Sequence, residues 1–459
     1  MKLSRRTILQ GAGSLAFAVA SFRNGALAQA PSAAKNPDNN PEVPPILFVH
    51  GNGDYDALWM TTLWRMESNG IARDRMMAIN FTNPTARTDD AVEQANRSST
   101  EDQRRELAAA IAELKRRTGA ARVALVGNSR GGNSIRNVIK NGGAADVSHA
   151  VLCGTPNHGV FALDDLLGSE FNGRGPFLRG LNGGDSEVTP GTAFLTLRSD
   201  GMDKYAQPDG RFMGKPGVAT NVTAEGPELK GATNLVLGTI DHRETAYHPR
   251  AFREIYKFIA GREPARIAIT PEQTVRISGL VTGAVDGVPT NRPVAGAVVE
   301  VNHVDRESGE RRGVMHRSTT GADGRWGAAE VDPTSPIEIV LTSPDAPTTH
   351  FYRSPFPRSS NVVHLRAARP LTPADKDAGA VLIMSRPRGY FGLPRDTVLF
   401  DGREPADVHP GVPTDATATL RLPASEGRRN VVAQFNEERI VARAWPASEN
   451  RIAVAEMTY

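Results

Sequence analysis

The sequence predicts an α/β fold, in which a mostly parallel sheet is flanked by helices, followed by an all-β C-terminal part. From residue 45 to about residue 263, short apolar runs alternate with segments of helical periodicity, which is typical of a parallel sheet with helices on both faces. From residue 264 onward, short β-rich runs are separated by Gly, Pro and Asp, as in sandwiches and barrels. A chain of 459 residues is also too long for one ordinary domain.

The first 28 residues have the layout of an export signal. A basic start is followed by an apolar stretch over residues 8–22 and by the small-residue end Ala26-Leu27-Ala28. Residues 4–9, Ser-Arg-Arg-Thr-Ile-Leu, resemble the twin-arginine motif, which implies that the twin-arginine translocase exports the chain to the periplasm or the medium. A retained N-terminal anchor is the alternative. Residues 29–44, rich in Pro, Asn and Ala, are expected to form a linker.

The charge balance gives no support to a nucleic-acid partner. The formal charge is +3, but removal of residues 1–28 takes away four of the 54 basic residues and none of the 51 acidic ones. The remaining chain is close to neutral, whereas nucleic-acid binding needs a basic face. The single cysteine, Cys153, lies in an apolar run and is interpreted as a small buried hydrophobe.

Continuous apolar runs locate the strands of the α/β part, because strands buried on both faces have this pattern. A helix precedes the third of these strands: Leu107, Ile111 and Leu114 share one face, Thr100 and Gln103 have capping-box spacing, and Gly119 can end the helix. The predicted strands are residues 46–49, 76–81, 123–126, 150–153, 194–197 and 234–237.

The C-terminal part is divided at two places, near residue 263 and, less clearly, near residues 370–375. We expect a β-sandwich over residues 264–370 and a further strand-rich region over residues 371–459, which could form one barrel with the preceding part. The predicted strands are residues 275–281, 297–304, 337–341, 362–365, 381–384, 398–400, 417–422, 431–435 and 440–442.

The pentapeptide Gly127-Asn128-Ser129-Arg130-Gly131 fits the pattern G-x-S-x-G. The string alone is weak, but it follows an apolar strand and opens a helical pattern. A strand-to-helix elbow of this kind holds its serine in a tight turn, with glycines that allow the backbone to approach closely. Ser129 is therefore the candidate nucleophile, and a solvated turn serine is the alternative.

An acid and a base should follow the serine in that order along the chain. Asp203 comes just past the end of the predicted strand 194–197, at the edge where such sheets place functional groups. The segment from Asp203 to Pro208 resembles the acid loop of lipases and cutinases. Asp200 is the competing candidate, although it could instead brace the turn through backbone amides.

His242 follows the next strand, residues 234–237, and is the candidate base. His248 precedes Pro249 and is expected to be an exposed residue at a helix start. His158 precedes the acid in the chain, which argues against a role as base, although it could line the pocket.

The turn His50-Gly51-Asn52-Gly53 follows the first apolar strand. The backbone N–H groups of Asn52 and Arg130 are candidate donors to the oxyanion that forms when Ser129 attacks a carbonyl. A plain tight turn is the alternative for residues 50–53.

Together these motifs resemble the α/β-hydrolase superfamily, and most closely bacterial and archaeal lipases that carry a C-terminal β domain. Three stretches of the β part, residues 279–281, 293–297 and 319–324, resemble carboxypeptidase-regulatory-like sandwiches. The resemblance implies a serine esterase that acts on small-molecule, lipid or polyester substrates, with contact to a lipid or polymer surface through a lid or through the β domain. Many lipases have His and Met beside the nucleophile, where this chain has Asn128 and Arg130. Arg130 could bring a positive charge near the pocket, which argues against a purely apolar triglyceride preference.

About forty residues separate Cys153 from Phe194, far more than an ordinary connection between a strand and a helix. Apolar residues punctuate this Gly-rich insert, and residues 159–193 are a candidate lid over an acyl pocket. A helix and loop that pack without moving are the alternative.

The sequence contains no metal-ligand or dinucleotide motif outside the signal, so no metal and no cofactor are expected. Carboxylic ester hydrolysis by Ser129, His242 and Asp203 is the leading hypothesis. Acyl transfer or amide cleavage by the same triad is the second, since fold and triad do not fix the acceptor. An exported surface-binding protein whose catalytic part has lapsed is the third.

Overall fold

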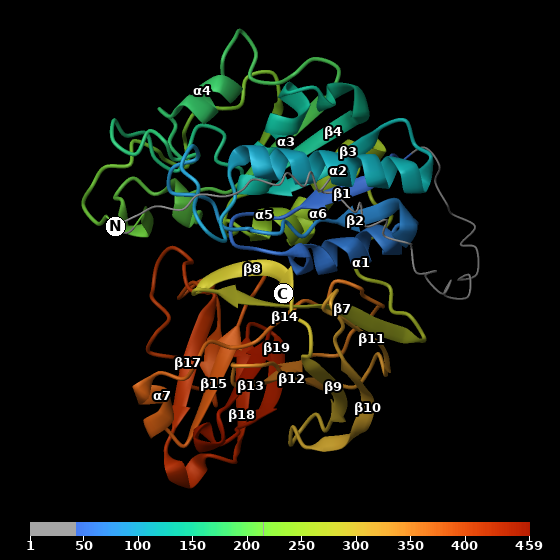
Figure 1. The fold of residues 1–459 in the computed structure, drawn as a ribbon, viewed down its shortest axis with the longest axis vertical. Coiled ribbons are helices and arrows are strands. Elements are labelled where there is room, and N and C mark those ends of the chain that lie inside the picture. Colours follow the sequence, from blue (N-terminus) through green and yellow to red (C-terminus); the bar gives the residue numbers. More distant parts are fainter. Residues whose placement is uncertain (1–42, 214) are drawn as a thin grey trace, which may run out of the picture. The chain divides into compact units, whose positions relative to one another are not determined.

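The structure is a computed structural model that describes residues 43–213 and 215–459 (Figure 1). The predicted signal, residues 1–28, and the linker up to residue 42 lie outside the described residues, so export stays a prediction. Within the described ranges, no helix is both long and apolar enough to cross a membrane.

The α/β part is built on a six-stranded sheet in the order β2-β1-β3-β4-β5-β6, in which all neighbours are parallel (Figure 1). The structure confirms the predicted fold class. The predicted strand 76–81 is shorter, because pairing with β1 ends at Ala78. The strands are β1 (Ile46–Val49), β2 (Met76–Ala78), β3 (Val123–Asn128), β4 (Val147–Cys153), β5 (Ala193–Arg198) and β6 (Thr233–Val236).

Alternate residues of β1 explain why both faces of this sheet are covered. Ile46 and Phe48 belong to a core that includes apolar residues of α1 and α6, whereas Leu47 and Val49 belong to a core with α2 and α3. Because neighbouring side chains of a strand point to opposite faces, a continuous apolar run needs helices on both sides. The helices are α1 (Met60–Ser68), α2 (Thr100–Thr118), α3 (Arg130–Lys140), α4 (Pro176–Leu181), α5 (Glu244–Tyr247) and α6 (Pro249–Ala260).

The start of α2 differs from the prediction by one residue. The capping box is formed by Ser99 and Asp102, with Ser99 Oγ accepting from the backbone N–H of Asp102, and not by Thr100 and Gln103. Thr100 is already helical, and Gln103 is buried against Ser134. The predicted end is confirmed, since Gly119 has the left-handed conformation that ends a helix.

The C-terminal part is all-β apart from one helical turn, α7 (Pro373–Asp377), and short 3₁₀ segments. Its largest sheet has the order β10-β9-β12-β13-β20-β15-β17, and β20 pairs in parallel with both β13 and β15. Strands from both sides of residue 370 therefore share one sheet. The strands of this sheet are β9 (Val298–Val304), β10 (Arg311–Thr319), β12 (Ile337–Thr342), β13 (Thr348–Arg353), β15 (Ala380–Ser385), β17 (Thr417–Leu422) and β20 (Arg451–Glu456).

Two smaller sheets complete this part. One contains β7, β8, β11 and β14, and the other contains β16, β18 and β19. Their bounds are β7 (Val275–Val285), β8 (Val288–Pro293), β11 (Arg325–Val331), β14 (Leu365–Arg366), β16 (Val398–Phe400), β18 (Asn430–Phe435) and β19 (Glu438–Arg443).

Five strands were not predicted: β8, β10, β11, β13 and β20. Strand β10 is mostly exposed and carries arginines and a glycine, so it lacks the alternation that marks a half-buried strand. Strand β20 is buried but short and contains two alanines, which have little strand preference.

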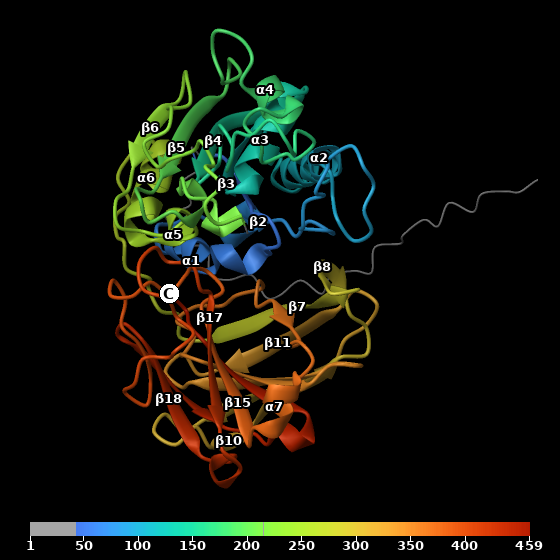
Figure 2. The same cartoon turned by 90° about the vertical axis from the view of Figure 1, so that its left-hand side faces the viewer.

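The α/β part and the β part share one hydrophobic core. The cluster that contains Phe48 and Trp64 continues without a break to Val299 and Ile339 of the β part. The Trp64 ring packs edge-on against Phe356, with 5.7 Å between the ring centroids, and its Nε1 donates to the carbonyl of Ser359 at 3.0 Å. Figure 2 shows the neighbouring strands β3, β4 and β5 of the α/β part from a second side.

This shared core predicts that the full chain unfolds in one cooperative transition. Trp64→Ala should lower the free energy of unfolding by about 3–5 kcal/mol, because the ring is buried between both parts. Scanning calorimetry of the wild type and the variant measures this. Two resolved transitions, with only one shifted by the substitution, would contradict a common core.

Candidate active site

Ser129 stands between the end of β3 and the start of α3, with φ 54° and ψ −125°. A non-glycine residue rarely adopts this conformation, and it persists only where the surroundings fix it. The backbone N–H of Ser129 donates to the carbonyl of Cys153 on the neighbouring strand β4, at 2.9 Å. The geometry is that of a strand-to-helix nucleophile elbow.

Three glycines make room for this elbow. A Cβ added at Gly51 would lie 3.0 Å from the Cβ of Ser129, and one at Gly131 would lie 2.5 Å from the carbonyl oxygens of both Val49 and His50. A Cβ at Gly127 would lie 2.8 Å from the carbonyl carbon of Gly131. The glycines are therefore required by close approach of backbone to backbone.

Asp203 and His242 are brought together by two neighbouring strands. Asp203 follows β5, His242 follows β6, and His242 Nδ1 lies 2.8 Å from Asp203 Oδ2. The other carboxylate oxygen of Asp203 accepts from the backbone N–H of Tyr205 at 2.8 Å, which fixes the carboxylate. The Tyr205 ring packs edge-on against the imidazole, with 4.6 Å between centroids.

The second imidazole nitrogen, His242 Nε2, is buried and has no hydrogen-bond partner among the described residues. Ser129 and His242 line the same cavity. The structure thus places the imidazole and the hydroxyl at one site, although it forms no hydrogen bond between them.

Asp200 and His248, the alternatives to Asp203 and His242, form contacts away from the imidazole of His242. Asp200 accepts from the backbone N–H groups of Met202 and Thr239, at 3.1 and 2.8 Å, and so braces two turns. His248 caps α6 by accepting from the backbone N–H of Arg250, and it is half-buried rather than exposed. Burial lowers the pKa of His248 to about 4.

His158 is also occupied elsewhere, since its Nε2 lies 3.0 Å from Glu187 Oε1. The wall of the cavity that contains Ser129 and His242 includes neither His158 nor His248, and it does not include Asp200. His158 therefore does not line this cavity, the role that the sequence had left open for it.

The turn after β1 places Asn52 on the cavity wall. The amide of Arg130 is the first of α3 and has no acceptor within the helix. His50 braces the turn, because its Nδ1 donates to the Gly51 carbonyl at 2.9 Å and its Nε2 accepts from the N–H of Phe81 at 3.1 Å. Burial lowers the pKa of His50, which keeps the ring in the neutral form that these two roles require.

The side chain of Arg130 corrects one expectation. It is fully buried, forms an ion pair with Glu170 at 2.6 Å, and donates to the carbonyls of Pro84 and Ser98. It does not line the cavity. The sequence could not show this, because the partner carboxylate lies forty residues away in the chain.

The cavity has a volume of about 250 Å³ and two chemically different sides. Its apolar side includes four residues of the candidate lid, and its polar side includes Asp54, Arg243 and Lys215. Sequence reasoning missed two aromatic residues of this wall, Tyr205 and Tyr390, the second of which comes from the β part. The apolar lining residues are Val160, Phe161, Leu166, Phe171, Phe212 and Met213.

The single cysteine, Cys153, does not line the cavity. Cys153 is fully buried in β4, and burial raises the pKa of its thiol. In the part of the chain that the structure describes, no group of three or more His, Cys, Asp or Glu side chains is placed to hold a metal ion.

Two family models match the chain. Residues 45–192 match palmitoyl protein thioesterase, and residues 273–370 match the lipase C-terminal domain. A search of curated proteins gave no significant match.

Solved structures with similar chains include lipases and a phospholipase. A lipase of Bacillus licheniformis in its propeptide form is 17% identical, with 66% of this chain and 72% of that chain covered and a TM-score of 0.35. Phospholipase PlaB of Legionella pneumophila is 15% identical, with 71% and 94% covered and a TM-score of 0.32. The parallel sheet and the serine elbow show that residues 45–263 have the α/β-hydrolase fold, and the part that follows contains a match to a lipase C-terminal domain.

Proposed function

We propose that the protein hydrolyses carboxylic esters with Ser129 as nucleophile, His242 as general base and Asp203 as the residue that orients the base. The observation that carries this proposal is the 2.8 Å contact between His242 Nδ1 and Asp203, beside a cavity that Ser129 lines from a strained elbow. This order of elements, with the acid after one strand and the histidine after the next, is that of α/β-hydrolases.

The proposed reaction begins when His242 Nε2 takes the proton of Ser129 as its Oγ attacks the substrate carbonyl carbon. Asp203 accepts from His242 Nδ1–H, which selects the tautomer with a free Nε2 and stabilises the imidazolium. Collapse of the tetrahedral intermediate expels the alcohol, which receives the proton from His242. Water then attacks the acyl-enzyme by the same route and releases the acid.

The N–H groups of Asn52 and Arg130 are the proposed oxyanion donors. Removal of one such donor costs about 3–4 kcal/mol in comparable sites. Both belong to backbone that cannot easily shift, since Gly51 and Gly131 pack against Ser129 and the end of β1. The donors are therefore organised before the substrate binds.

The apolar side of the cavity supports an acyl chain as the substrate group bound there. The family match to palmitoyl protein thioesterase is consistent with an acyl substrate of some length. Leu166, in the candidate lid, lines the cavity and is 48% exposed, while its neighbour Leu167 is 45% exposed and does not line it. The exposed pair supports contact of this segment with a lipid or polymer surface.

Asp203→Asn should lower kcat by about 10³- to 10⁴-fold, because the histidine loses its orienting carboxylate. Asp200→Asn is the matched control, since Asp200 contacts backbone amides of neighbouring turns and the hydroxyl of Ser199, and no contact joins it to His242. Steady-state kinetics on a short soluble ester measures both variants. Equal losses of kcat in the two variants, or a larger loss in Asp200→Asn, would contradict the assignment of Asp203 as the acid that orients His242.

Leu166→Ser should lower kcat/KM for long-chain esters by about tenfold relative to acetate esters, because it removes apolar contact with the acyl chain. Leu167→Ser provides the control for loss of an exposed leucine. Hydrolysis is followed over an acyl-length series, below and above micelle formation. A preference for acetate, with smooth saturation through the micellar range, would contradict both the acyl pocket and the lid.

A further inference from the structure

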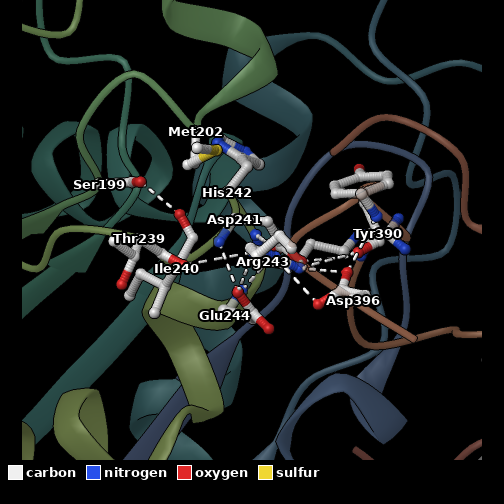
Figure 3. A network of polar contacts seen from close by, with 12 residues as sticks. Ser199, Met202, Thr239, Ile240, Asp241, His242, Arg243, Glu244, Tyr390 and Asp396 are labelled. Carbon is white, nitrogen blue, oxygen red and sulfur yellow. Dashed lines mark hydrogen bonds and ion pairs between the residues drawn. The ribbon is translucent and has the colours of Figure 1, made fainter. Parts of the chain in front are cut away.

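The histidine loop is held by two buried carboxylates, Asp241 just before His242 in the sequence and Glu244 two residues after it (Figure 3). Asp241 Oδ1 accepts from the backbone N–H groups of Arg243 and Glu244, at 2.8 and 2.9 Å. Glu244 Oε2 accepts from the N–H of Asp241 at 2.5 Å. The two side chains therefore define the turn from which His242 projects.

Two negative charges this close, and out of water, repel each other. Burial raises the pKa of Asp241, and repulsion from Glu244 raises it further. Left without cations, the turn would have to take up a proton or open. The α/β part supplies no arginine to either carboxylate among the ion pairs of the described residues.

The cations come from a loop of the β part that follows β15, residues 386–396, here called the 386–396 loop. Arg386 donates to Asp241 Oδ2 at 2.8 Å and to Glu244 Oε1 at 2.5 Å. Arg395 donates to Glu244 Oε2 at 2.9 Å and is itself paired with Asp396. Two arginines thus pair with the two carboxylates of the histidine turn, and Asp396 shares the charge of Arg395.

The 386–396 loop packs closely against α5 at Gly389. A Cβ there would lie 2.5 Å from the guanidinium carbon of Arg386 and 2.6 Å from the hydroxyl of Tyr247. The glycine therefore lets Arg386 pass between its own loop and α5. Burial lowers the pKa of Arg386, but Tyr247, Glu244 and Asp241 outweigh this and raise it, so the side chain stays charged.

The same loop also reaches the substrate cavity. The backbone N–H of Tyr390 donates to Asp241 Oδ2 at 2.8 Å, and its carbonyl accepts from Arg386 at 2.6 Å. These two contacts fix the Tyr390 ring on the cavity wall, between Lys204 Nζ, 3.7 Å from the ring centroid, and Arg243, 5.1 Å from it. Tyr390 lies beside the histidine turn in Figure 3.

We infer that the 386–396 loop belongs to the active site. Arg386 and Arg395 are positioning residues for His242, and Tyr390 forms a wall of the substrate cavity that determines specificity. This inference rests on the proposed function, because it takes His242 as the base. It gives the β domain a role inside the catalytic site, distinct from contact with a surface.

Arg395→Ala in the full chain tests the positioning role. Arg395 is preferred to Arg386 because its side chain is 17% exposed against 3%, so its loss disturbs the core less. We expect kcat on a short ester to fall about 10- to 100-fold with KM little changed, because the histidine is displaced while the acyl pocket is intact. Arg395→Lys should recover part of kcat. Arg403→Ala, at an exposed arginine of the same part, is the matched control.

Tyr390→Ala tests the specificity role. Removal of the ring widens the cavity, so we expect kcat/KM for bulky esters to rise by about tenfold relative to acetate, and Tyr390→Phe to restore most of the wild-type profile. Thermal midpoints measured in parallel separate misfolding from altered catalysis.

The outcomes distinguish this inference from the proposed function. If Ser129→Ala is inactive while folded Arg395→Ala and Tyr390→Ala keep the wild-type kcat and ester profile, the inference is overturned and the proposed function stands. If Ser129→Ala retains activity, the proposed function itself fails.

Discussion

The conformation of Ser129 is the constraint to which the rest of the site is fitted. Its positive φ is held from one side by the hydrogen bond to Cys153 on β4, and from the other by α3, where Gly131 packs directly on the carbonyls that end β1. Since β1, β3 and β4 are adjacent in the sheet, the elbow cannot relax without separating strands. The donor turn, the acid and the histidine follow β1, β5 and β6, so all of them reach the same edge of the sheet.

Burial of charge is the second constraint, and it connects the two parts of the molecule. Asp241 and Glu244 shape the histidine turn only while cations neutralise them, and those cations come from residues more than 140 positions later. The same principle accounts for Arg130, whose charge is compensated by Glu170 inside the protein. Arg130, beside Ser129, and Asp241, beside His242, are thus paired inside the protein. Arg243, on the other side of His242, lines the cavity, whose remaining surface is mostly aromatic and aliphatic.

The sequence was sufficient to predict those features that depend on residues close together in the chain. Two of the three glycines that make room for the elbow lie in one pentapeptide with Ser129. The strand order of the fold then led to Asp203 and His242, which the structure brings within hydrogen-bond distance. Features made by distant contacts left no such pattern. Tyr390 reaches the cavity only because a sheet with strands from both sides of residue 370 carries its loop there, and strand β10 has an exposed, polar sequence that resembles a loop.

The proposed reaction depends on activation of Ser129 by His242. Its most direct measurement is covalent labelling by a fluorophosphonate, followed by mass mapping of the modified peptide, because only an activated serine attacks such a probe at a useful rate. We predict a single adduct on Ser129, lost in Ser129→Ala and formed far more slowly in His242→Ala. An unlabelled wild-type protein, or an adduct on another serine, would contradict it.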